Sequence, residues 1–181
     1  MKKENSSKKL SSKGFALLEL LVVVLIIGIL SAIALPQYKY VVTKARFTQL
    51  LIASKAIKDA QTRYMLLHGE RSLDLSVLDM DIESGTYGPG SYSSANKKDR
   101  INFDWGNCQI AYNPNRTNLS CSLNKPRIYY FIDFIDQYKI CCASAESGNI
   151  GKKICQAQFP NATGTASTDY CGAGATIYKG Y

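Results

Sequence analysis

The chain has 181 residues, of which 46% are apolar and 20% charged, a composition that excludes wholesale disorder and allows one domain with a modest core. Its formal net charge is +8 at pH 7, and half of that excess lies in residues 1–14, where five lysines accompany one glutamate. Lysines directly before an apolar run indicate the cytoplasmic side of a membrane rather than a nucleic-acid surface.

An apolar run extends from Phe15 to Leu35, and its single charged residue is Glu19. As an α-helix this run is about 31 Å long, which is enough to cross the hydrocarbon core of a bilayer. Pro36 follows it and removes one backbone donor, so we expect the helix to kink or loosen there. The sequence therefore predicts a basic leader over 1–14 and the transmembrane half of a longer helix over 15–35.

The helical pattern continues beyond Pro36, with apolar residues at three- and four-residue steps and most charges on the other side. Gly69 is a typical helix stop, and His68 before it suits the C-terminal end of the helix dipole. We expect residues 36–68 to form an amphipathic half. Its predicted buried face consists of Tyr38, Val41, Val42, Ala45, Ile52, Ala53, Ala56, Ile57, Ala60, Tyr64 and Leu67.

The second half of the chain has the pattern of a small antiparallel sheet. Residues 69–107, rich in Gly and Ser, are expected to form a connecting loop. Four short runs of β-forming residues follow, at 108–112, 117–121, 127–135 and 138–143. Pro114-Asn115 and Asp136-Gln137 are expected to form tight turns between them. This gives a meander over 108–143, a loop region over 144–181 and, with the helix, an α+β fold.

Six cysteines lie in the second half: Cys108, Cys121, Cys141, Cys142, Cys155 and Cys171. None follows a C-x-x-C spacing and the only histidine is His68, so the pattern favours disulfides in an oxidising compartment over zinc. A two-residue turn at 114–115 places Cys108 opposite Cys121, within reach of a bond. Cys141 and Cys142 point to opposite faces of a strand and need different partners. We favour Cys142–Cys155 with Cys141–Cys171 over the exchanged pairs by a small margin.

The sequence contains little that suggests catalysis. It has no Gly-rich phosphate loop, nucleophile elbow or metal-binding helix, so we expect no enzyme activity, cofactor or metal. Asp79, Asp81 and Glu83 resemble the start of a calcium loop, but Ser84 and Gly90 stand where its glycine and closing glutamate belong. Basic clusters such as Lys97-Lys98 are interpreted as solvated loop charge rather than a DNA site.

The front end, "KGFALLELLVVVLIIGILSAIALPQY", resembles the N-terminal signature of type IV prepilins and type II secretion pseudopilins. A basic leader ends at Gly14, the aromatic residue Phe15 follows, Glu19 is the fifth residue after the junction, and Pro36, directly after the apolar run, is the twenty-second. The resemblance implies that a prepilin peptidase cuts the Gly14–Phe15 bond and methylates the Phe15 amine. It also implies a lollipop-like fold in which a long helix carries a disulfide-stapled sheet.

Glu19 has a physical role under this interpretation. A lone carboxylate at membrane depth costs a few kcal/mol on insertion scales, so it needs a partner. After cleavage the nearest cation is the α-amine of Phe15, one helical turn away. In a filament the partner can be the α-amine of a neighbouring subunit, as the family's assembly scheme implies.

The implied function is a structural subunit of a type IV pilus or similar filament, polymerising through its N-terminal helix. The implied partners are copies of itself, other pilins, prepilin peptidase, the inner-membrane assembly platform and membrane lipid, with DNA or surfaces as further candidates. The chain would span the inner membrane once, with its N-terminus cytoplasmic, and then enter a surface or extracellular pilus.

Two alternatives remain open from the sequence. The first is a type II secretion pseudopilin, which would assemble in the periplasm. The second is a secreted, non-polymerising disulfide-bonded protein, because Ala32-Ile33-Ala34 also resembles a signal-peptidase site. Glu19 within the apolar run and the helix that continues past this site count against the second.

Overall fold

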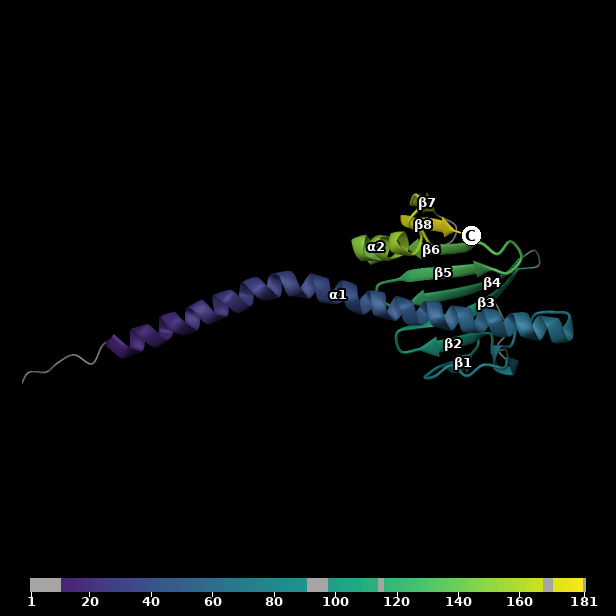
Figure 1. Ribbon diagram of the computed structural model, residues 1–181, viewed down its shortest axis with the longest axis horizontal. Coiled ribbons are helices and arrows are strands. Elements are labelled where there is room, and N and C mark those ends of the chain that lie inside the picture. The colour runs from purple at the N-terminus through teal and green to yellow at the C-terminus, as the bar shows by residue number, and fades with distance from the viewer. Residues whose placement is uncertain (1–10, 91–97, 114–115, 168–170, 181) are drawn as a thin grey trace, which may run out of the picture. The chain divides into compact units, whose positions relative to one another are not determined.

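The computed structural model describes residues 11–90, 98–113, 116–167 and 171–180. The chain divides into two compact units, residues 1–41 and residues 42–181. Helix α1, Ser11–His68, runs through both of them, and Pro36 lies inside it. The second unit contains the sheet (Figure 1).

The end of α1 follows the predicted stop. Gly69 has a φ of +77°, a left-handed conformation that costs glycine little. Its amide donates to the carbonyl of Met65 at 2.9 Å, which satisfies one of the free carbonyls of the last turn. The ring of His68 lies against that of Tyr64, tilted by 31°, with ring centroids 4.2 Å apart.

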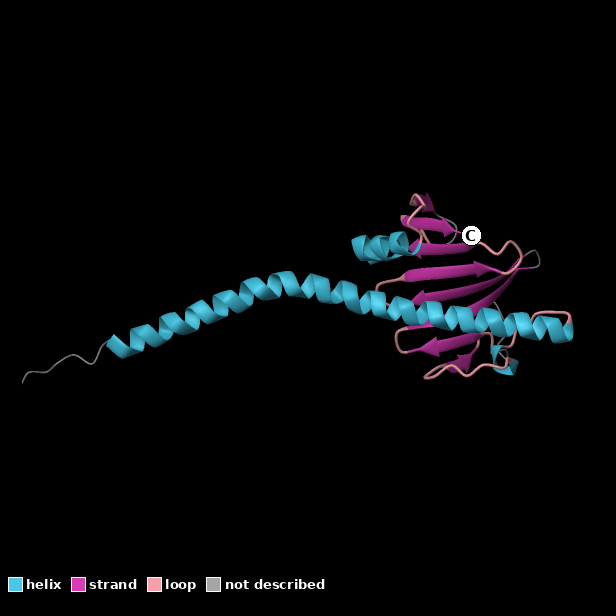
Figure 2. Ribbon diagram, in the orientation of Figure 1, coloured by secondary structure: helices cyan, strands magenta, loops and turns pink. Residues whose placement is uncertain are grey.

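The sheet is larger than predicted, with eight antiparallel strands in the order β1-β2-β3-β4-β5-β6-β8-β7 (Figures 1 and 2). The strands are β1 Thr86–Gly88, β2 Arg100–Phe103, β3 Gly106–Asn113, β4 Arg116–Leu123, β5 Ile128–Asp133, β6 Lys139–Ala143, β7 Thr165–Ser167 and β8 Ala175–Gly180. A helix, α2 Gly148–Gln158, follows β6, and single 3₁₀ turns, η1 and η2, occupy Leu75–Val77 and Ala145–Ser147.

The predicted meander is confirmed as β3 to β6. Cys108 pairs with Cys121 in the register that a two-residue turn requires, while the turn residues 114–115 lie outside the described residues. The turn after β5 is longer than predicted, because the amide of Asp133 bonds the Tyr138 carbonyl at 3.0 Å. The Asp133 carboxylate accepts the amides of Ile135 and Asp136 at 2.8 and 3.0 Å and so shapes this longer turn.

The prediction that residues 69–107 and 144–181 form loops is wrong in part. The connecting region 69–107 contributes β1 and β2, and the tail 144–181 contributes α2, β7 and β8. Helix α2 buries Gly151, Ile154 and Cys155 on one side. A side chain at Gly151 would come within 2.1 Å of the Ser147 hydroxyl, so the glycine permits a close approach. These elements depend on residues outside their own segments. Strand β2 pairs with β3 and β8 pairs with β6, and Cys155 of α2 is bonded to Cys141 of β6.

The main core lies between the sheet and α1 from Val42 onward. Its helical side chains are Phe47, Leu50, Ala53, Ile57 and Ala60, all buried. The predicted face is therefore only partly right: Ala53, Ile57 and Ala60 belong to it, but Ile52 is 66% exposed and Leu67 80% exposed. Apolar residues occupy more than one side of this helix, and packing decides which side meets the sheet.

Tyr130 of β5 is one of the buried side chains of that core. The Phe47 ring meets it edge-on at a centroid distance of 6.2 Å. The ring of Phe159, just after α2, is near parallel to it at 6.5 Å. Burial disfavours the charged phenolate and raises the pKa of Tyr130 to about 12. Both helices thus pack on the same face of the sheet.

The opposite face carries a smaller cluster built around Tyr138, Ile140, Cys142 and Ala175. Side chains of Tyr129, Phe131, Cys171 and Ile177 pack against it. Successive residues of a strand point to opposite faces, so β6 contributes Cys141 to the first face and Cys142 to this one. The sheet is consequently covered on both sides near β6 and β8.

Candidate assembly site

The predicted processing and assembly residues all lie on the N-terminal part of α1. The Gly14–Phe15 bond falls within the helix. The described helix from Phe15 on is long and apolar enough to cross a membrane, and its most apolar stretch is not buried within the protein. Its exposed large side chains up to Leu35 are Phe15, Leu17, Leu18, Leu20, Leu21, Val22, Val23, Val24, Leu25, Ile26, Ile27, Ile29, Leu30, Ile33 and Leu35.

Exposure on this scale limits the environments that suit the segment. Fully burying one such side chain is worth about 1.5–3 kcal/mol, so the segment forgoes on the order of tens of kcal/mol in water. A monomeric soluble protein rarely exposes an apolar surface of this extent. Lipid, or a bundle of similar helices, is the environment that matches it.

Glu19 is the exposed carboxylate within that surface. It lies one turn beyond Phe15, about 6 Å further along the axis, and the two residues share a side of the helix. Cleavage before Phe15 would create an α-amine within reach of this carboxylate or of a neighbour's. The segment around Pro36 is helical on both sides of the proline, so a kink there stays a prediction.

The disulfides confirm one predicted pair and correct the other two. Cys108 bonds Cys121 across β3 and β4, with Cα atoms 4.0 Å apart. The favoured pairing of the remaining four is wrong: the bonds are Cys141–Cys155 and Cys142–Cys171. Cys141 faces the side of the sheet that carries α2, whose Cys155 is buried there. The unpredicted helix therefore decides the choice.

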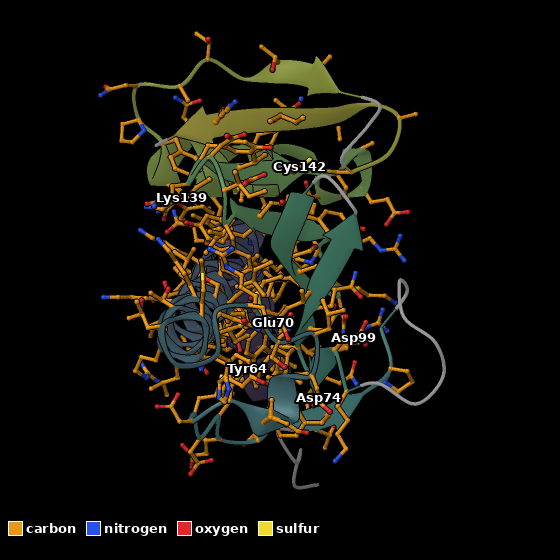
Figure 3. All side chains as sticks on the ribbon, turned by 90° about the vertical axis from the view of Figure 1, so that its right-hand side faces the viewer. Tyr64, Glu70, Asp74, Asp99, Lys139 and Cys142 are labelled. Atoms are coloured by element: carbon orange, nitrogen blue, oxygen red, sulfur yellow. A yellow bond between two sulfur atoms is a disulfide. The ribbon has the colours of Figure 1, made fainter. Side chains whose placement is uncertain are left out.

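Sequence reasoning missed a polar clip between α1 and the segment that returns from it. Figure 3 labels Tyr64 of the helix and Glu70 and Asp74 of the returning segment. The side chain of Gln61 is fully buried. Its Nε2 donates to the Ser72 carbonyl at 2.7 Å, and its Oε1 accepts the Ser72 amide at 3.2 Å. A glutamine amid apolar helical positions was the only sequence signal.

The acidic segment that resembled a calcium loop has another role. Asp79 binds Arg63 of α1 through two bonds, Nε to Oδ2 at 2.8 Å and Nη2 to Oδ1 at 2.9 Å. The same Nη2 donates to the Asp79 carbonyl at 3.1 Å. These hydrogen bonds hold the pKa of Asp79 below its usual range. Asp79 therefore fastens its loop to the helix.

Comparison with known proteins agrees with this geometry. Residues 9–35 match the family model described as the prokaryotic N-terminal methylation motif. The fimbrial protein of Neisseria meningitidis serogroup B is 43% identical over 58 residues, which are 32% of this chain and 34% of that protein. A type IV major pilin protein of Neisseria gonorrhoeae is 41% identical over 58 residues, 35% of its length. The match thus spans about a third of these relatives.

A longer match decides the family. The fimbrial protein of Moraxella nonliquefaciens is 31% identical over 118 residues, 62% of this chain and 73% of that protein. The chain belongs to the type IV pilin family. The type IV major fimbrial protein of Dichelobacter nodosus is 26% identical over 160 residues, 87% of this pilin and 89% of that protein. No solved structure matches this pilin significantly. The relatives are structural subunits rather than enzymes.

Proposed function

We propose that this pilin is a filament-forming subunit of a type IV pilus, released from the membrane into the fibre through its N-terminal helix. A prepilin peptidase cuts the Gly14–Phe15 bond and methylates the Phe15 amine. The chain then waits in the inner membrane with its N-terminus cytoplasmic and its second unit outside. The assembly platform moves it into a helical bundle with copies of itself and other pilins, which extends to the cell surface.

The observation that carries the proposal is the exposed apolar helix over Phe15–Leu35 with Glu19 as its carboxylate. In lipid this segment buries its side chains but leaves the carboxylate far from water. In a bundle the side chains stay buried, and the carboxylate can meet an α-amine. Transfer from lipid to filament then improves the electrostatics at no loss of apolar burial.

Processing is tested by mass spectrometry of the mature N-terminus. A peptide beginning at methylated Phe15 is expected. Gly14→Val should block cleavage, while Gly28→Ala should not, because a side chain at Gly28 meets no atom within 4 Å. A mature chain beginning at Leu35 would instead establish a secreted, non-polymerising protein.

Assembly is tested with Glu19→Ala. Membrane insertion should be intact or improved, since the charge cost at membrane depth disappears. Filament yield should fall, because the α-amine of a neighbour loses its partner. Ser31→Ala is the matched control, a polar-to-alanine change in the same apolar run, and should assemble normally. Equal yields of sheared fibres from Glu19→Ala and wild type, at equal membrane levels, would contradict the role of Glu19.

A secretion pseudopilin is the second candidate. The relatives described above, a fimbrial protein and a type IV major pilin protein, favour the pilus. Fibres recovered from the cell surface by shearing would support the pilus, whereas a subunit confined to the periplasm beside secretion-channel components would support the pseudopilin.

A further inference from the structure

One flank of α1 carries an open groove of about 350 Å³ within the second unit. Ile52 and Ala56 of α1 form one wall, Ile82 of the loop before β1 forms the other, and Phe103 and Trp105 lie at its base. This volume falls at the lower end of the range for ligand-sized sites. Because Ile52 is 66% exposed, the apolar wall is open to solvent.

The groove combines aromatic rings with carboxylates. Phe103 and Trp105 stack in parallel, with centroids 4.6 Å apart. Asp81 and Glu83 line it as well, and both are exposed. Among the described residues that line it, none is Lys, Arg or His. Ring faces beside carboxylates favour an occupant with an aliphatic stem and a cationic head.

The loop that forms the outer wall is held in place. Arg63 of α1 grips Asp79 at its start through the paired hydrogen bonds described above. The Gly85 amide bonds the Ile82 carbonyl at 3.2 Å at its other end. A side chain at Gly85 would stand 2.6 Å from Ile101, so the loop lies directly against the sheet. The groove is therefore preformed, and an occupant would not have to order it.

The other flank of α1 has the opposite charge. Lys44 and Thr48 of α1 border a shallow pocket together with Ile154 and Ala157 of α2. Lys44 is exposed, as is Lys153, which stands one helical turn before Ala157 on the same side of α2. Figure 1 shows α2 beside one flank of α1, and β1 and β2 beyond the other. We call the surface of Lys44 and Lys153 the basic flank.

We propose that the groove receives the basic flank of a second copy of the chain, with a lysine stem over the half-buried ring of Trp105, which Phe103 supports from beneath, and its ammonium group between Asp81 and Glu83. The occupant cannot be the chain's own Lys44. This residue lies eight positions before Ile52, about 12 Å along a single helix, and helical side chains lean toward the N-terminus, away from the groove.

The contact is heterologous, because groove and basic flank are different surfaces of one subunit. Such contacts do not close into a two-fold dimer but continue from subunit to subunit. The inference rests on the proposed filament function and deepens it by naming the surfaces of the second unit that meet. It also assigns the sign of charge on each side.

Charge exchange in the full-length chain tests it. Asp81→Lys with Glu83→Lys, and separately Lys44→Glu with Lys153→Glu, should each lower sheared-filament yield by about tenfold or more, since each places like charges face to face. All four changes in one chain should restore assembly. Co-expression of the two double variants should also restore it, because each then offers the other a complementary surface.

The matched control is Glu70→Lys with Asp136→Lys, which makes the same change of charge at exposed residues outside the groove and should assemble normally. Defects in both double variants without restoration in the fourfold variant would overturn the proposed contact. So would normal assembly of either double variant. If wild type itself forms no filament, the proposed function fails; if wild type forms filaments and the exchange fails, only this contact is refuted.

Discussion

The sharpest stability prediction concerns the buried side-chain amide of Gln61. Gln61→Leu keeps the side-chain volume but removes both hydrogen bonds to the backbone of Ser72. Each half-buried backbone group left without a partner costs about 1–3 kcal/mol. Leucine regains part of this through apolar burial. We expect a net loss of about 2–4 kcal/mol in the free energy of unfolding.

The assay is urea unfolding of residues 42–181, the second compact unit, produced in an oxidising compartment. Gln49→Leu on an exposed position of the same helix is the control and should change stability by less than about 0.5 kcal/mol.

Gln61→Glu adds a pH test. At neutral pH the new carboxylate cannot donate to the Ser72 carbonyl and is buried against it, so the variant should be less stable than wild type. Burial raises the pKa of that carboxyl above its unfolded value of about 4.3, and its deficit should shrink as pH falls from 7 toward 4. A Gln61→Leu variant as stable as wild type, or a Gln61→Glu deficit indifferent to pH, would refute this account of the clip.

Three further predictions concern the second unit. Replacing both cysteines of Cys141–Cys155 by alanine should lower the free energy of unfolding by about 3 kcal/mol. Replacing those of Cys142–Cys171 should lower it by about 3.5 kcal/mol, because that bond closes a loop of 29 positions rather than 14. Non-reducing peptide maps should recover both bonded pairs. Burial raises the pKa of Tyr130 to about 12 in the folded state, whereas the unfolded side chain ionises near pH 10. The free energy of unfolding should therefore fall by about 2–3 kcal/mol between pH 10 and pH 12, and Tyr130→Phe should lack that loss. Gly106→Ala should lower the free energy of unfolding by about 1–3 kcal/mol or more, because the added Cβ would stand 2.2 Å from the Ser122 carbonyl oxygen. Gly88→Ala is the control and should change it little, because its Cβ would stand 3.4 Å from the side-chain amide nitrogen of Asn102.

The N-terminal helix could be predicted because its signal is local. Charge, apolar length and the positions of Gly14, Phe15 and Glu19 can be read without knowing what packs on them. The β3–β4 hairpin was predictable for the same reason, since a short turn sets the register of its two cysteines.

The face of α1 and the presence of α2 depend on distant residues. Around Leu50 and Ile52, apolar side chains point both toward the sheet and away from it, and only the sheet selects Leu50. In α2 the helical signal is short: Ile150, Ile154 and Cys155 follow a helical step, but glycines at 148 and 151 weaken it. Its packing on β6 and the bond of Cys155 to Cys141 supply what local propensity does not.

The placement of the disulfides has a mechanical consequence. All three lie at or beyond Cys108, so the chain from residue 42 to residue 107 crosses none of them. If a filament is put under tension and a subunit is pulled by its helix, residues 42–107 can unfold and extend to about 220 Å. Unfolding of the strands from β3 onward would then release less length, because the residues between two bonded cysteines cannot extend while the disulfide is intact. Such a subunit would lengthen by this stretch before the residues enclosed by the disulfides bear the load, and chemical reduction would add those residues to its extended length.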